Sequence, residues 1–170
     1  MPEKKRCHWC EGDPLLERYH DQEWGIAPKS DNELFERMSL QIFQAGLNWK
    51  LILSKRANFL KSFDRFNLVK VAKYDDQKLQ QLLNDPGILR NRRKIEAVIH
   101  NARVIREIKL EYKSFQNYLD SLPDRLNIIQ VELRKRFKFL GPEISRMFVM
   151  NIGKIAPPHE RNCWRYQEKK

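Results

Sequence analysis

Residues 79–99 read LQQLLNDPGILRNRRKIEAVI, and this stretch decides the expected fold. Apolar residues recur at helical spacing on both sides of Asp85-Pro86-Gly87, a combination that is typical of a tight turn. We therefore predict a helix, a turn at Pro86-Gly87-Ile88 and a second helix. Over about residues 76–109 this pattern indicates a helix-hairpin-helix.

The predicted hairpin has the chemistry of a phosphate contact. Gly87 lets backbone N–H groups approach a phosphate closely, and the second helix offers its positive N-terminal end. The basic side chains that add charge there are Arg90, Arg92, Arg93 and Lys94. Such contacts position a duplex without reading its sequence. The alternative is an ordinary helix connection with a solvated basic face.

The composition indicates a polyanionic partner. The 170 residues include 33 Lys and Arg against 22 Asp and Glu, which gives a net charge of +11. Nucleic acid is the first candidate partner and an anionic membrane surface is the second. Nothing resembles a signal peptide or a membrane span, and the three cysteines cannot all pair with one another. We expect a cytoplasmic monomer that does not enter a membrane.

Helical periodicity covers almost the whole chain, and β-branched alternation is nearly absent, so we expect an all-α fold. Asp31 is expected to cap a helix that runs through Ile42. Further helices are expected at about 49–63, 76–83, 92–109, 114–121, 127–137 and 143–152. With no internal repeat or linker, we expect residues 1–170 to form one domain in which two helical lobes share a cleft.

Candidate metal ligands lie near both ends of the chain. Cys7 and His20 are close to the start, and His159 and Cys163 are close to the end. A closed shell of two thiolates and two imidazoles suits a structural zinc ion, which would pin the two ends together. The spacing alone also fits ordinary, partly buried Cys and His, and Cys10 forms a second metal-type spacing with Cys7.

Aromatic residues are concentrated in the first third of the chain. Trp9, Tyr19 and Trp24 precede the motif Phe43-Gln44-Ala45-Gly46-Leu47-Asn48-Trp49. Flat aromatic faces can sandwich an unstacked base, and they attract a cationic base. Any single Trp is more often part of a core. Several of them beside a Gly turn in a basic protein favour a base-binding site.

Several short motifs together resemble those of a known family. They are Cys7-x-Trp9, Asp13-Pro14-Leu15, Tyr19-His20-Asp21-x-Glu23-Trp24-Gly25, Gln44-Ala45-Gly46-Leu47-x-Trp49, Gly87-Ile88, Arg93-Lys94-Ile95, Asn101-Ala102-Arg103, Phe137-Lys138-Phe139-Leu140-Gly141 and His159-x-x-x-Cys163. The chain resembles the DNA-3-methyladenine glycosylase I family from Cys7 to Cys163. The resemblance implies a zinc-clasped helix-hairpin-helix DNA glycosylase. Such an enzyme is monofunctional and excises 3-methyladenine from alkylated double-stranded DNA in base excision repair.

The same resemblance implies roles for individual residues. The zinc ligands would be Cys7, His20, His159 and Cys163, with Cys10 outside the shell. The pocket for the flipped base would contain Trp9, Tyr19, Gln41 and Trp49. Gly46 and Leu47 would enter the gap that the base leaves, because an apolar wedge can replace lost stacking. The contacts with the DNA backbone would come from Gly87, Arg90, Arg93 and Lys94.

Three positions depart from the family pattern. Gln41 replaces the usual glutamate, Leu16 a usual tyrosine and Ile42 a usual glycine. A neutral amide keeps the shape of a carboxylate but loses its charge, so we expect altered or broadened preference among alkylated purines. The alternatives are a non-catalytic protein that binds alkylation lesions and, on charge and aromatic content alone, an RNA-directed binder.

No catalytic acid or base is assigned from the sequence. A base that already carries positive charge leaves as a neutral purine, so its departure needs no protonation. Glu107 and Glu111 lie on a Lys- and Arg-rich helix, where solvated or ion-paired carboxylates are common.

Overall fold

The computed structural model describes residues 4–167, and this part of the chain contains helices and no strand. The elements are α1 (Pro14–Gln22), α2 (Asp31–Gln44), α3 (Trp49–Ser54), α4 (Arg56–Ser62), the 3-10 turn η1 (Asp64–Phe66), α5 (Leu68–Ala72), α6 (Asp76–Leu83), α7 (Arg92–Tyr112), α8 (Phe115–Ser121), α9 (Leu126–Arg136) and α10 (Pro142–Asn151). The all-α prediction is confirmed for these residues. Residues 1–3 and 168–170 of the predicted domain lie outside the described part.

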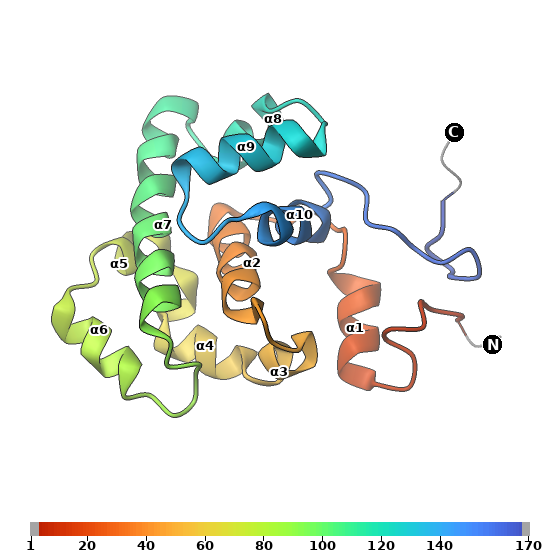
Figure 1. Cartoon of the computed structure of the whole chain (residues 1–170), viewed down its shortest axis with the longest axis horizontal. Helices are drawn as coiled ribbons and strands as arrows, with labels where there is room; N and C mark the ends of the chain where they lie inside the picture. The colour runs from red at the N-terminus through yellow and green to blue at the C-terminus, as the bar shows by residue number, and fades with distance from the viewer. Residues whose placement is uncertain (1–3, 168–170) are drawn as a thin grey trace.

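Helix α2 is the centre of the fold (Figure 1). Every residue from Leu34 to Phe43 is buried, because α2 packs against α3, α5, α7, α8 and α10. One apolar core joins the helices from α2 to α10, and burial of this surface is the main stabilising term. The division into two lobes around a cleft stays a prediction.

Two helices were missed by the sequence analysis, and one predicted helix is divided. Helix α1 begins after Asp13, whose carboxylate accepts from the backbone N–H groups of Leu15 and Leu16. Helix α5 is only five residues long, too short for a periodicity signal. The predicted helix over 49–63 is interrupted at Lys55, which separates α3 from α4.

The cap of α2 also differs from the prediction. Ser30 is the N-cap, and its hydroxyl accepts from the backbone N–H of Glu33 at 3.2 Å. The carboxylate of Asp31 instead accepts from the backbone N–H groups of Phe115 at 3.1 Å and Gln116 at 3.2 Å. Asp31 therefore joins the start of α2 to the start of α8.

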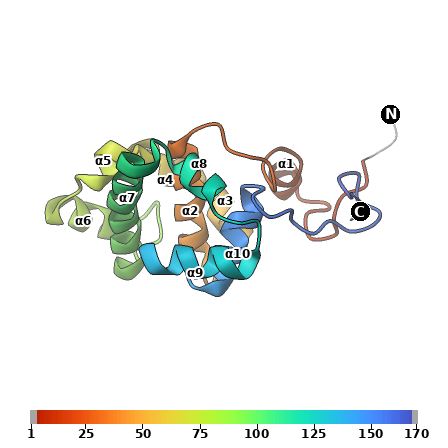
Figure 2. The ribbon, with the colours of Figure 1, turned by 90° about the horizontal axis from the view of Figure 1, so that it is seen from above.

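The two ends of the described chain lie side by side next to α1 (Figures 1 and 2). The backbone N–H of Trp164 donates to the carbonyl of Lys5 at 2.9 Å. The N–H of His8 donates to the Glu160 carboxylate at 2.9 Å. Irregular segments of this kind have few backbone partners of their own, so cross-links between the ends must hold them in place.

Candidate functional site

The predicted metal ligands come together where the two ends meet. The ligand atoms of Cys7, His20, His159 and Cys163 all lie within 4.8 Å of one another. The sulfur of Cys163 is 3.4 Å from His20 Nε2 and 3.7 Å from His159 Nδ1. A tetrahedral shell with ordinary zinc bond lengths places its sulfur and nitrogen atoms about 3.6 Å apart. The four residues are close enough to hold a metal ion.

Neighbouring groups orient these ligands. Asp21 Oδ1 lies 2.9 Å from His20 Nδ1, which turns Nε2 toward the cluster. The backbone N–H of Glu160 donates to the sulfur of Cys7, and that of Arg165 donates to the sulfur of Cys163, each at 3.4 Å. Donors aimed at sulfur favour the thiolate, which is the form that binds a metal.

The protonation states agree with a metal site. Burial is the main reason that the pKa of His159 falls to about 4, so its imidazole is neutral and can act as a ligand at pH 7. Burial opposes ionisation of Asp21, but hydrogen bonds led by that of Arg6 outweigh it and lower its pKa to about 2. Burial raises the pKa of Cys7 to about 11, so a metal cation would have to displace the proton.

Cys10 is not one of the clustered ligands. Its thiol is fully buried beside Cys7 and Cys163, but it donates to the carbonyl of Cys7 at 3.1 Å. The sequence left open whether Cys10 belongs to a metal site, and the geometry gives it a hydrogen-bonding role in the turn that follows Cys7.

The predicted aromatic residues surround Tyr19. The ring centre of Tyr19 is 5.2 Å from that of Trp49, 6.2 Å from that of Trp24 and 6.3 Å from that of Trp9. Tyr19 and Trp24 are buried, whereas Trp9 is 43% exposed and Trp49 is half-buried. The cluster therefore has a buried floor and rings that reach the surface.

Polar groups in this region lack partners. The indole N–H groups of Trp24 and Trp49 are buried and have no hydrogen-bond acceptor among residues 4–167. Gln41, on α2, is also buried, at 1% exposed. Buried polar groups are normally paired, so these two indole donors are available to a ligand.

Gln41 faces the same side of α2 as Arg37. The two residues are one helical turn apart, and Arg37 donates to the side-chain and backbone oxygens of Asn151. The side-chain amide of Asn151 donates in turn to the Tyr19 hydroxyl. Arg37 and Asn151 were not predicted as site residues. Neither belongs to a motif, and their contacts depend on how α1, α2 and α10 pack.

The turn after α2 presents Leu47 to solvent. Gly46 has a φ of +76°, a conformation that favours glycine, and Leu47 is 40% exposed. The side chain of Gln44 donates to the carbonyl of Leu47 at 2.8 Å, and the N–H of Leu47 donates to the carbonyl of Gln44 at 2.7 Å. An apolar side chain is thus held outward on a closed turn.

Lys94 supports this turn from α7. Its ammonium is buried and donates to the carbonyl of Phe43 at 2.9 Å and to that of Ala45 at 2.7 Å. A cation at the C-terminal end of α2 satisfies carbonyls that have no partner within the helix. This differs from the DNA-facing role predicted for Lys94, and it ties the helix-hairpin-helix to the Gly46-Leu47 turn.

The segment between α6 and α7 lies at the lower edge of the molecule in Figure 1. The N–H of Gly87 donates to Asp85 Oδ1 at 2.8 Å. A side-chain carbon at Gly87 would lie 3.2 Å from Asn58 Cγ, so a larger residue would require Asn58 on α4 to shift by a few tenths of an ångström. Arg90 and Arg93 are exposed at the start of α7, where the first N–H groups of a helix attract anions.

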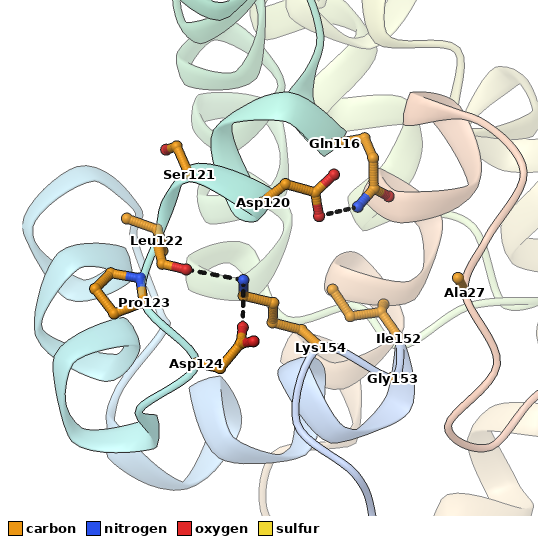
Figure 3. Close-up of a pocket in the computed structure, with 10 residues that line it drawn as sticks. All are labelled: Ala27, Gln116, Asp120, Ser121, Leu122, Pro123, Asp124, Ile152, Gly153 and Lys154. Atoms are coloured by element: carbon orange, nitrogen blue, oxygen red, sulfur yellow. Dashed lines mark hydrogen bonds and ion pairs between the residues drawn. The ribbon is translucent and has the colours of Figure 1, made fainter.

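A separate groove of about 610 Å³ contains none of the predicted site residues (Figure 3). Lys154 crosses it and donates to the carbonyl of Leu122 at 2.8 Å and to the carboxylate of Asp124 at 2.7 Å. Lys154 is thus already paired with Asp124, and Asp120 accepts from the side-chain amide of Gln116 at 2.8 Å, so no unpaired cation is present among the residues drawn.

The all-helical fold of the described residues matches that of 3-methyladenine DNA glycosylase I structures. The family model for methyladenine glycosylases matches residues 9–166. The chain belongs to the methyladenine glycosylase family. It is therefore a DNA glycosylase, a hydrolase that acts on N-glycosidic bonds.

Named relatives agree with this membership. DNA-3-methyladenine glycosylase 1 of Escherichia coli (strain K12) is 33% identical, over 95% of this chain and 97% of the relative. A crystal structure of 3-methyladenine DNA glycosylase I has a TM-score of 0.86 at 31% identity, covering 96% of this chain and all of the other. A glutamate-to-glutamine mutant of the Staphylococcus aureus 3-methyladenine DNA glycosylase I has a TM-score of 0.83 at 28% identity, covering 97% and 99%.

No helix within residues 4–167 is long and apolar enough to cross a membrane.

Proposed function

We propose that this protein extrudes alkylated purines from double-stranded DNA and hydrolyses their N-glycosidic bonds. 3-Methyladenine is its first substrate, and Gln41 broadens its preference. The relatives named above are 3-methyladenine glycosylases, which supports the substrate class. The observation that carries the proposal is the aromatic cluster around Tyr19, whose buried indole donors have no partner within the described residues.

Different residues bind the extruded base and fill the gap that it leaves in the duplex. Trp49 stacks on the flipped base, while Tyr19 and Trp9 line its edges. Leu47 enters the vacated gap from the Gly46 turn. Unstacking a base costs a few kcal/mol, least for damaged pairs. With these roles, the base would enter between α1 and the segment that joins α2 to α3, and this would be the cleft expected between the two lobes.

Little further chemistry is needed once the base is bound. A purine alkylated at a ring nitrogen carries positive charge and leaves as a neutral molecule. The protein has to orient the base and to exclude unproductive conformations of the nucleotide. Aromatic rings and neutral hydrogen-bond donors are suited to both tasks. No residue is proposed as a general acid, a general base or a Schiff-base nucleophile.

We propose that the metal is Zn²⁺ and that its role is structural. Two cysteines and two histidines form a shell without an open position for substrate, and this donor set is typical of structural zinc. The aromatic cluster begins directly beside it, since the ring centre of Trp9 is 5.5 Å from that of His20. The metal centre would thus fix the position of one pocket wall.

Gln41 decides how strongly a cationic base is held. A buried carboxylate would attract the positive charge of an alkylated purine, and a charge-assisted hydrogen bond is roughly twice as strong as a neutral one. The amide of Gln41 still offers a donor and an acceptor, which fit the edge of adenine or the acceptors of guanine. We therefore expect lower affinity for 3-methyladenine and weaker discrimination among alkylated purines than a carboxylate would give.

Substituting Gln41→Glu tests this proposal. We expect roughly 5- to 150-fold faster release of 3-methyladenine, corresponding to about 1–3 kcal/mol of charge-assisted binding, and a narrower product spectrum. Native and variant proteins are incubated with randomly methylated DNA, and the released bases are identified by chromatography and mass. Gln77→Glu, on the exposed surface of α6, is the control for the added charge.

The outcomes separate the candidate functions. Unchanged rates and spectrum in Gln41→Glu would show that residue 41 does not set the preference. Lesion binding by both proteins without release of any base would favour the non-catalytic damage-binding alternative. The damage-binding alternative rests on Gln41, whose buried side chain is uncharged.

The proposed contacts of Arg90 and Arg93 with DNA phosphates predict how the affinity for DNA depends on salt. Substituting Arg90→Ala or Arg93→Ala should reduce the slope of log affinity against log salt by about 1 each, because each removes one phosphate contact. Binding to an undamaged duplex is measured by fluorescence anisotropy between low and moderate salt. Arg134→Ala, an exposed arginine on α9, removes the same charge elsewhere and should leave the slope nearly unchanged.

A further inference from the structure

Asn151 binds the hydroxyl of Tyr19, the central ring of the aromatic cluster. Asn151 is 1% exposed at the end of α10, and its side-chain nitrogen donates to the Tyr19 oxygen. Tyr19 is itself 4% exposed. A hydrogen bond between two buried polar side chains is directional, so the identity of donor and acceptor matters for what else the hydroxyl can do.

Arg37 determines which way the Asn151 amide faces. The Arg37 guanidinium donates to Ile26 O at 2.7 Å and also lies within hydrogen-bond distance of Glu23 O, Asn151 O and Asn151 Oδ1, the last at 3.5 Å. Arginine has donors and no acceptor. The opposite orientation would set the amide nitrogen of Asn151 against the guanidinium, donor against donor. The amide oxygen therefore faces Arg37 and the amide nitrogen faces Tyr19.

The hydroxyl proton of Tyr19 is consequently free for a ligand. Its oxygen accepts from Asn151, and no acceptor among residues 4–167 receives its proton. A tyrosine hydroxyl is neutral at pH 7, so it keeps that proton. Together with the unpaired indole donors of Trp24 and Trp49, this gives a cluster that offers donors.

We propose that Arg37 and Asn151 act as positioning residues that fix the Tyr19 hydroxyl as a donor to a ring nitrogen of the bound purine. The inference rests on the proposed function, because it assigns a ligand to the same pocket. A neutral donor suits the lone pairs at N1 and N7 that a 3-alkyladenine retains. We call the series of hydrogen bonds from Arg37 through Asn151 to Tyr19 the relay. A purine alkylated at N7 has lost one of these acceptors, so the relay favours 3-alkyl over 7-alkyl lesions.

The Asn151→Asp variant reverses the polarity of the relay with almost no change in shape. A carboxylate paired with Arg37 accepts the Tyr19 proton, which leaves only lone pairs facing the base. We expect about tenfold weaker binding of free 3-methyladenine, measured by calorimetry on the full-length zinc-loaded protein. In a Tyr19→Phe background the same substitution should change binding less than about twofold.

This double-mutant comparison separates positioning from structural support. If Asn151 merely holds α10 against α1, Asn151→Asp will weaken binding equally with and without the Tyr19 hydroxyl, and the inference is wrong. If Asn151→Asp does not fold, Asn151→Leu replaces it. Leucine leaves the hydroxyl unoriented, so a loss of about threefold that vanishes in the Tyr19→Phe background is expected, and equal losses overturn the inference.

Analogues identify the acceptor on the base. The 1-deaza and 7-deaza forms of 3-methyladenine each replace one ring acceptor by C–H. One of them should bind the native protein about tenfold more weakly than 3-methyladenine and show no further loss with Asn151→Asp. Equal binding of all three bases would overturn the assignment of a ring nitrogen as the acceptor.

A separate measurement tests the hydrogen bond without any base. The side-chain amide proton of Asn151 that faces Tyr19 should shift upfield in the NMR spectrum of Tyr19→Phe, because it loses its acceptor. An unchanged resonance overturns the relay whether or not the protein is a 3-methyladenine glycosylase. If the resonance shifts but native protein neither binds nor releases an alkylated base, the relay stands as a structural feature and the proposed function fails.

Discussion

We expect replacement of Cys163 by Ser to abolish stoichiometric metal binding and to lower the midpoint of thermal unfolding by roughly 10–20 °C. The reason is that the cluster is where the two ends of the described chain are joined, and these ends have no helix of their own beyond α1. Loss of about 5 kcal/mol of metal-linked folding energy in a chain of this length gives a shift of that size. Metal content by mass spectrometry and unfolding by circular dichroism measure the two effects.

Cys10→Ser is the matched control for the metal centre. Cys10 is buried near Cys7, yet its thiol donates to a backbone carbonyl, a bond that a serine hydroxyl can also make. We expect this variant to keep one zinc ion per chain. Retention of metal by Cys163→Ser, or its loss from Cys10→Ser, would show that the ligand set is different. Removal of metal from the native protein by a chelator should reproduce the instability of Cys163→Ser.

We expect Trp49→Ala to lower kcat/KM for the proposed release of 3-methyladenine by roughly 5- to 150-fold. Stacking on an aromatic side chain contributes about 1–3 kcal/mol per base. Trp49 is half-buried at the edge of the Tyr19 cluster, so the fold should survive the truncation. Single-turnover release from methylated DNA measures the effect, and thermal unfolding of the same variant checks that the loss is not one of stability.

Trp49→Phe separates stacking from hydrogen bonding. Phenylalanine keeps an aromatic face but removes the indole N–H, which has no acceptor among the described residues. A loss much smaller than that of Trp49→Ala is expected if stacking dominates. Equal losses in the two variants would show that the indole donor, rather than the ring face, is what the base requires.

The sequence predicted the parts of this fold that depend on local pattern. Helices α2 and α7 follow their apolar periodicity, and the Pro-Gly turn between α6 and α7 lies where expected. Helix α1 was missed because only a few of its residues are apolar, although Asp13-Pro14 is a start signal. Asp31 was given the wrong cap role because its tertiary partner, the start of α8, is far away in sequence.

The site was predicted less completely than the fold, for a related reason. The metal ligands could be named by resemblance, and the structure brings those four together. The buried ammonium of Lys94 was grouped with solvent-exposed arginines, because charge in a sequence does not reveal which cation covers a helix end. Arg37 and Asn151 carry no motif, and only the packing of α2 against α10 makes them partners.

The bonds from Lys94 have a mechanical consequence. They attach the start of α7, where a phosphate would be held, to the end of α2, where Leu47 projects. Because a buried ammonium joins these two elements, their separation would stay constant when the protein binds a duplex in the proposed way. With the proposed contacts, the extruded nucleotide would lie at a fixed number of steps from the bound phosphate, and the protein would test successive base pairs as it slides along DNA.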